Sequence, residues 1–178
     1  MASTPVYDRR TRQLHWIVAA LIAFLWLMAQ GNSLLHKGPV RQSIWSIHVL
    51  VGFVLAALVA WRLVWRLTRR DRLPPAQQGI WQAAATAVHF LLYLLMIAVV
   101  VLGVMNVFGH GFPLFNTWRF PKFWEKPFQQ QVADWHGLAA NVIAGVAVLH
   151  AAAALWHHWV LRDGVLRRMW PAKADTGQ

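Results

Sequence analysis

The chain has 178 residues, of which 58% are hydrophobic, only 13% are charged and twelve are tryptophan, and this composition is typical of a membrane protein rather than a soluble one. Its formal net charge of +11 comes from basic clusters at the ends of apolar runs, which argues against a nucleic-acid-binding face. Because cysteine is absent, disulfides, thiolate catalysis, iron–sulfur clusters and zinc–thiolate sites are excluded.

Four apolar runs follow one another, and each is long enough to cross about 30 Å of hydrocarbon as an α-helix. We predict membrane spans at residues 13–30, 44–67, 81–108 and 132–160, with the longest loop at 109–131. The first run has no clean A-x-A cleavage site, so we interpret it as a span and not as a signal peptide. The sequence therefore predicts one domain, residues 1–178, folded as an all-α bundle of four transmembrane helices.

Lysine and arginine are distributed unequally between the two ends of these spans. The N-terminus, the second loop with the end of the span before it, and the C-terminal tail hold twelve of them, whereas the first and third loops hold five. The positive-inside rule then places both termini in the cytoplasm, which agrees with an even number of crossings.

Besides His157 and His158 at the end of the fourth span, five histidines lie inside the predicted spans, at positions 15, 48, 89, 136 and 150. An imidazole in hydrocarbon is costly without a partner, so each is a candidate functional group. His136 and His150 are fourteen residues apart, which places them on one helical face about 21 Å apart along the axis. In the predicted topology, His48 lies at the depth of His136, whereas His15 and His89 lie at the depth of His150.

Two histidines at one depth on facing helices can clamp a flat metal macrocycle from both sides. The pattern therefore favours two such sites, one in each leaflet, although depth alone leaves His15 and His89 as alternative partners of His150. Structural hydrogen bonds, or a zinc or proton-relay transporter, would also use buried imidazoles. Asp134, at the start of the fourth span, is the only acidic residue within the bounds of the spans, which weakens the transporter interpretation.

Each span carries a short motif around its histidine: QLHW in the first, SIHVLVG and then RLVWRL in the second, VHFLLYLL in the third, and WHGLAANVIAGVAVLHAAAALWHH in the fourth. Together these motifs resemble the bacterial cytochrome b561 family over nearly the whole chain. The likeness is greatest to its short di-haem members, which oxidise superoxide and reduce ubiquinone, and it extends to the cytochrome b subunits of formate dehydrogenases and hydrogenases. It implies two haem b groups between the helices and a location in the bacterial inner membrane.

The resemblance also implies the ligands. His48 and His136 are expected to hold the iron of the outer haem, and His15 and His150 that of the inner haem. His89 is expected beside a haem propionate or the quinone and not on the iron.

Arg62 and Arg66, four residues apart on one helical face, are candidate partners of the haem propionates, because a guanidinium fork matches a carboxylate. They would serve equally well as interfacial anchors that extend toward the membrane surface.

The two ends of the bundle have different candidate substrate sites. At the cytoplasmic end, His157 lies two turns beyond His150 on the same face and is the first candidate to contact ubiquinone, with Gln13 as a weaker one. At the external end, Arg119, Lys122 and Lys126 would produce a positive field that steers superoxide, although ordinary interfacial cations would look the same.

The resemblance therefore implies a superoxide:ubiquinone oxidoreductase. An iron with two axial imidazoles has no open position, so the haems would carry electrons without binding substrate, and no catalytic residue is assigned. The alternative function is a quinol-linked electron relay that serves another redox protein or complex.

Overall fold

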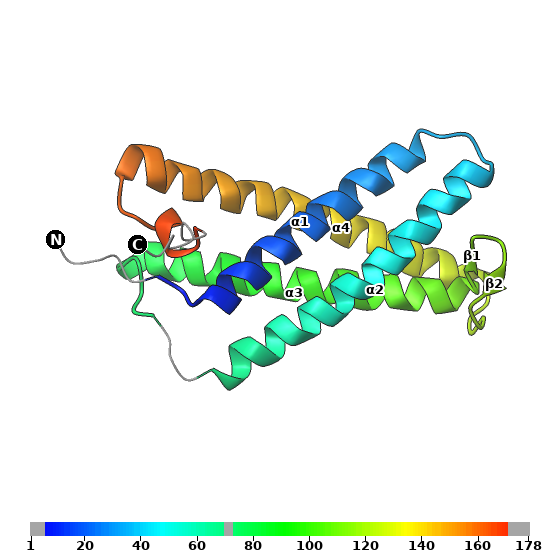
Figure 1. Ribbon diagram of the computed structural model, residues 1–178, viewed down its shortest axis with the longest axis horizontal. Helices are drawn as coiled ribbons and strands as arrows, with labels where there is room; N and C mark the ends of the chain where they lie inside the picture. Colours follow the sequence, from blue (N-terminus) through cyan, green and yellow to red (C-terminus); the bar gives the residue numbers. More distant parts are fainter. Residues whose placement is uncertain (1–5, 70–72, 171–178) are drawn as a thin grey trace, which may run out of the picture.

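The structure is a computed structural model that describes residues 6–69 and 73–170. Within them lie four long helices, α1 (Arg9–Ser33), α2 (Pro39–Thr68), α3 (Gly79–His110) and α4 (Lys126–Trp156). All four are long and apolar enough to cross a membrane. Figure 1 shows an elongated bundle in which α1 and α2 cross α3 at an angle. The prediction of an all-helical fold with four spans is confirmed.

Local sequence signals explain where the helices begin and end. The side chain of Asp8 accepts a hydrogen bond from the Thr11 N–H at 3.1 Å and so caps α1. Proline occupies the first turn of both α2 and α4, where its missing N–H has no cost. After α3, Gly111 adopts the left-handed conformation at φ +60° and closes the helix with a bond to the Val107 carbonyl.

Most helices begin or end a few residues outside the predicted spans. Their terminal turns are polar, so a prediction from hydropathy alone does not detect them. The largest difference is in the third loop, which was predicted at 109–131 and is confined to residues 111–125. The stretch from Lys126 to Gln131 forms the first turns of α4 instead. At its other end α4 continues into a five-residue π-helix, η1 (His157–Leu161), which a short 3₁₀ turn, η2 (Leu166–Arg168), follows.

The loop between α3 and α4 contains a small hairpin whose antiparallel strands are β1 (Pro113–Leu114) and β2 (Trp118–Arg119). Its tight turn places Phe115 and Asn116 at φ +48° and +58°, a conformation that is uncommon outside glycine. Two bonds from this turn region reach α2: the Phe115 N–H donates to the Ser46 hydroxyl at 2.8 Å, and the Gln42 amide donates to the Pro113 carbonyl at 2.6 Å. The hairpin is therefore fastened to the second helix.

The helices pack mainly in two pairs, α1 against α2 and α3 against α4. Their shared core lies in the middle of the bundle and consists of Val18, Leu25, Leu55, Val59, Met96 and Ile143. Most other apolar side chains face outward, as Phe90 and Leu149 do, which suits a surrounding of lipid. Since Ile143 lies midway between His136 and His150 in α4, the core separates two histidine-bearing regions.

The bond that fastens the hairpin is testable by removing one hydroxyl. Ser46 is fully buried, so Ser46→Ala leaves the Phe115 N–H without an acceptor and is expected to lower the free energy of unfolding by about 1–3 kcal/mol. Unfolding in a denaturing-detergent titration, followed by circular dichroism, measures this loss. Ser33→Ala is the matched control, because that exposed hydroxyl bonds only to the Gln30 carbonyl of its own helix. Equal losses in the two variants would contradict the role given to Ser46.

Candidate functional site

The bundle brings the span histidines together in two groups. In one half, His48 of α2 faces His136 of α4, with ring centroids 6.5 Å apart and ring planes at 87°. In the other half, His15 of α1 faces His150 of α4 at 6.4 Å and 83°. His89 of α3 lies closer to His150, at 5.3 Å and 70°. One helix therefore contributes an imidazole to each group.

These separations can be compared with what a shared metal requires. A metal–imidazole bond is about 2 Å long and the ring nitrogen lies roughly 1 Å from the ring centre, so two imidazoles on opposite sides of one iron have centroids about 6 Å apart. The pairs His48–His136 and His15–His150 meet this requirement. His89 lies too close to His150 to leave room for an iron between the two rings.

The ring of His136 is oriented by α3. Its Nδ1 lies 3.0 Å from the Val99 carbonyl oxygen, which can only accept, so Nδ1 carries the hydrogen and Nε2 keeps its lone pair for a metal. Gly103 makes room for this ring, because a Cβ at that position would lie 2.9 Å from His136 Cε1. The sequence motif identified His136 but not the carbonyl and the glycine that support it.

Two buried nitrogen atoms at the histidine groups are His48 Nδ1 and Arg62 Nη1. Neither has a hydrogen-bond partner within the described part of the chain. Buried polar atoms are normally paired, so each is open to a group from outside the chain. The rest of the Arg62 guanidinium is engaged: Nε donates to the Tyr93 hydroxyl at 3.2 Å, and Nη2 lies 3.4 Å from His15 Nδ1. An anion beside His15 and His150 could accept a hydrogen bond from the unpaired Arg62 Nη1.

Arg66 lies next to this group, with its guanidinium 4.7 Å from the centre of the Tyr93 ring. Tyr93 thus holds both predicted arginines, through its hydroxyl and its aromatic face. We did not single it out in the sequence, although it follows His89 by four residues and so shares its helical face.

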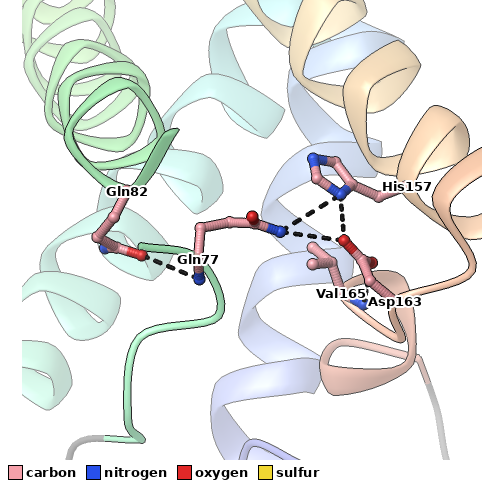
Figure 2. Close-up of polar contacts among 5 residues, drawn as sticks. All are labelled: Gln77, Gln82, His157, Asp163 and Val165. Carbon is pink, nitrogen blue, oxygen red and sulfur yellow. Dashed lines mark hydrogen bonds and ion pairs between the residues drawn. The ribbon is translucent and has the colours of Figure 1, made fainter. Parts of the chain in front are cut away.

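His157 lies at the start of η1, beyond the inner histidines. Its Nδ1 is 2.5 Å from Asp163 Oδ2, and the Gln77 amide donates to the same oxygen at 3.0 Å (Figure 2). Burial alone would raise the pKa of the Asp163 carboxyl, but the hydrogen bonds from His157 and from the Val165 N–H outweigh it and lower that pKa below its usual range. Asp163 was not predictable from the sequence beyond its position in the turn RDG that follows η1.

The other candidate at this end is not joined to His157. Gln13 is exposed near the start of α1, and within the described residues no hydrogen bond connects it to that ring. The neighbouring His158 lines a separate open pocket of about 280 Å³, together with Trp159, Arg162, Gly164 and Arg167.

The three candidate cations of the opposite end are exposed on the α3–α4 connection. Arg119 ends β2, Lys122 follows it, and Lys126 is the first residue of α4. Lys122 forms an exposed ion pair with Glu125 at 3.7 Å, which reduces the local positive field. The sequence analysis counted the lysine without this partner.

Comparison with known proteins identifies relatives along the whole chain. The family model described as prokaryotic cytochrome b561 matches residues 6–172. A cytochrome b562 of Cereibacter sphaeroides is 30% identical over 175 residues, which cover 95% of this chain and 98% of that protein. A probable superoxide oxidase CybB of Yersinia pestis is 28% identical over 170 residues, covering 90% and 93% of the two chains. Cytochrome b561 homolog 1 of Escherichia coli is 26% identical over 169 residues, covering 90% and 94%.

The close contact between Gly103 and the His136 ring predicts what happens when a methyl group is added at position 103. Gly103→Ala forces the ring to move, and overpacking of this kind costs about 1–3 kcal/mol, so if His136 is a haem ligand the affinity of the protein for haemin should fall about tenfold or more. A haemin titration followed by Soret absorption measures the change. Gly137→Ala is the control, because a Cβ there meets nothing within 4 Å. Unchanged haemin affinity in Gly103→Ala would contradict the assigned role of the glycine.

Proposed function

Because the chain belongs to the prokaryotic cytochrome b561 family and so is a membrane b-type cytochrome that transfers electrons, we propose that it takes electrons from superoxide on one side of the membrane and passes them to ubiquinone on the other. The overall reaction is 2 O₂⁻ + Q + 2 H⁺ → 2 O₂ + QH₂. The name of one relative, a probable superoxide oxidase, supports this choice of substrate.

The observation that carries the proposal is the pair of ring separations, 6.5 and 6.4 Å, in opposite halves of the bundle. We assign one haem b to each pair, with His48 and His136 as ligands of the outer haem and His15 and His150 as ligands of the inner one. When bound, each haem would supply a one-electron carrier held by the imidazoles of its pair.

Three neighbouring side chains are assigned to support the inner haem. Ligation by His15 through Nε2 requires a hydrogen on Nδ1, which ends its contact with Arg62 and frees that guanidinium for a propionate. Arg66 is placed to assist it from the Tyr93 ring. We assign His89 to the surroundings of the haem because its ring is too close to that of His150.

The two ends of the bundle receive different substrates in this proposal. His157, two turns beyond His150 on α4, hydrogen-bonds a ubiquinone carbonyl and exchanges its proton, with Gln13 as the weaker candidate contact. At the opposite end, Arg119, Lys122 and Lys126 attract superoxide. In this proposal the protein lies in the inner membrane of a bacterium, with both termini in the cytoplasm and the hairpin on the external side. The excess of basic residues on the side of the termini supports this orientation.

A second candidate is an electron relay that serves another redox protein. Two large aromatic side chains of the hairpin region, Trp118 and Phe123, are 54% and 64% exposed beside the external cations. Exposed aromatic and basic groups together are typical of protein-binding surfaces. Such a surface would receive a protein donor in place of superoxide.

The ligand assignment predicts haem content. His136→Ala and His150→Ala should each lose one haem, about half of the total, because each removes one axial ligand of a different group. The pyridine haemochrome absorbance per protein measures haem content in the purified variants. His89→Ala is the matched control and should retain both haems, whereas His15→Ala should lose one. Loss of a haem in His89→Ala with full content in His15→Ala would reverse the inner assignment.

The superoxide assignment predicts fast haem reduction. Stopped-flow mixing of the oxidised protein with superoxide should reduce the haems, and Arg119→Gln with Lys126→Gln should slow this step several-fold at low salt but little at high salt, because screening removes steering. Lys37→Gln, in the first external loop, is the single-charge control, against which Arg119→Gln and Lys126→Gln are also measured one at a time. Haems that remain oxidised after mixing would favour the relay function instead.

A further inference from the structure

The end of α4 has an unusual backbone that gives Asp163 its position. The helix widens into the π-helix η1 at His157, and the chain then reverses through Arg162 at φ +54° and Gly164 at φ +79°. Single turns of π-helix occur often at functional sites. The reversal brings Asp163, six residues later, back to the ring of His157, with the Asp163 N–H donating to the His157 carbonyl at 3.4 Å.

Both carboxylate oxygens of Asp163 are held in place. Oδ2 lies 2.5 Å from His157 Nδ1 and accepts from the Gln77 amide at 3.0 Å, while Oδ1 accepts from the Val165 N–H at 3.1 Å. Gln77 belongs to the loop before α3, and its own N–H donates to Gln82 Oε1 at 3.4 Å. Figure 2 shows the glutamine amide beside both the carboxylate and the ring, 3.5 Å from His157 Nδ1. Groups from two parts of the chain therefore fix the imidazole.

This contact determines which ring nitrogen can exchange a proton. The lowered pKa of Asp163 keeps the carboxyl ionised at neutral pH, and an ionised carboxylate can only accept hydrogen bonds. Nδ1 of His157 must then carry a hydrogen. Nε2 is left as the nitrogen that gains and loses a proton, and Figure 2 shows it pointing away from Asp163.

We propose that Asp163 and Gln77 are positioning residues that hold His157 with Nε2 directed at the head group of a benzoquinone as its proton donor. The inference rests on the proposed quinone reduction. In the step, the Nε2–H bond of doubly protonated His157 breaks, and an O–H bond forms on a quinone oxygen that has received an electron. His157 is left neutral with its hydrogen on Nδ1, and cytoplasmic water restores the Nε2 proton. Two such transfers, with two electrons from two superoxide ions, give the hydroquinone.

The expected effect of removing the Asp163 carboxylate follows from the loss of a fixed orientation of the His157 ring. Without the carboxylate, either ring nitrogen can carry the hydrogen and the ring can turn over, so only a fraction of the molecules present the correct nitrogen. Positioned acid–base groups contribute about 10²–10⁴-fold to rates, so we expect Asp163→Asn to slow proton-coupled quinone reduction about tenfold.

The experiment follows haem re-oxidation in the full, haem-loaded chain. The haems are first reduced with a stoichiometric amount of dithionite and then mixed with ubiquinone-1 in a stopped-flow instrument. Asp163→Asn should lower the limiting rate about tenfold and change the half-saturating ubiquinone-1 concentration little, and Asp163→Glu should recover part of the rate. Asp134→Asn is the matched control, because that acid is bonded only to Gln130 of its own helix, and it should react at the original rate.

A second readout does not depend on electron transfer. In protein labelled with ¹⁵N-histidine, the His157 resonances should report a hydrogen on Nδ1 in the original chain and a mixture of tautomers in Asp163→Asn. If Asp163→Asn loses haem or fails to fold, Gln77→Leu replaces it, since it removes one hydrogen bond to the carboxylate and should slow the reaction several-fold.

The outcomes separate this inference from the function on which it rests. If His157→Gln slows re-oxidation but Asp163→Asn matches the Asp134→Asn control, the positioning role is wrong and the quinone site stands. If His157→Gln also reacts at the original rate, the quinone binds elsewhere and both assignments are wrong. If ubiquinone-1 fails to re-oxidise the haems of the original chain, the proposed function itself is wrong.

Discussion

A buried imidazole needs a partner, and in a bundle with an apolar exterior that partner must come from inside. This constraint governs the arrangement of the four helices. α4 holds His136 and His150 on one face, and the other helices cross it so that His48 and His15 meet these rings at nearly equal distances. The core around Ile143 fills the space between the two levels with apolar side chains that do not ionise. Two similar histidine pairs thus result from the fourteen-residue spacing of His136 and His150 on one helix.

The sequence was sufficient to predict the parts of this arrangement that depend on hydropathy and helical spacing. Four spans, and the histidines inside them, follow from the length of the apolar runs and from a rise of about 1.5 Å per residue. The ends of α3 and α4 were not predictable in this way, because residues such as Gln129 and Gln130 extend a helix without adding hydrophobicity. Phe115 adopts a left-handed turn that its residue type does not favour, so the hairpin also had no local signal.

The partners of individual side chains were the hardest part to predict. Depth left His15 and His89 equivalent, and their different distances to His150 become visible only in the folded bundle. Asp163 reaches His157 through a π-helix and a chain reversal, neither of which a regular 3.6-residue period anticipates. Contacts such as Gly103 with His136 join residues of different helices, and a single sequence contains no spacing rule for them.

The packing of the helices in two pairs has a consequence for assembly. α1 associates with α2 and α3 with α4, yet the histidine pairs join α2 to α4 and α1 to α4, across the division between the two helical hairpins. A group held between such residues cross-links the two halves and, by mass action, stabilises the assembled form over separated hairpins. A haem that bound at either pair would therefore also favour the assembled bundle over its separated helical hairpins.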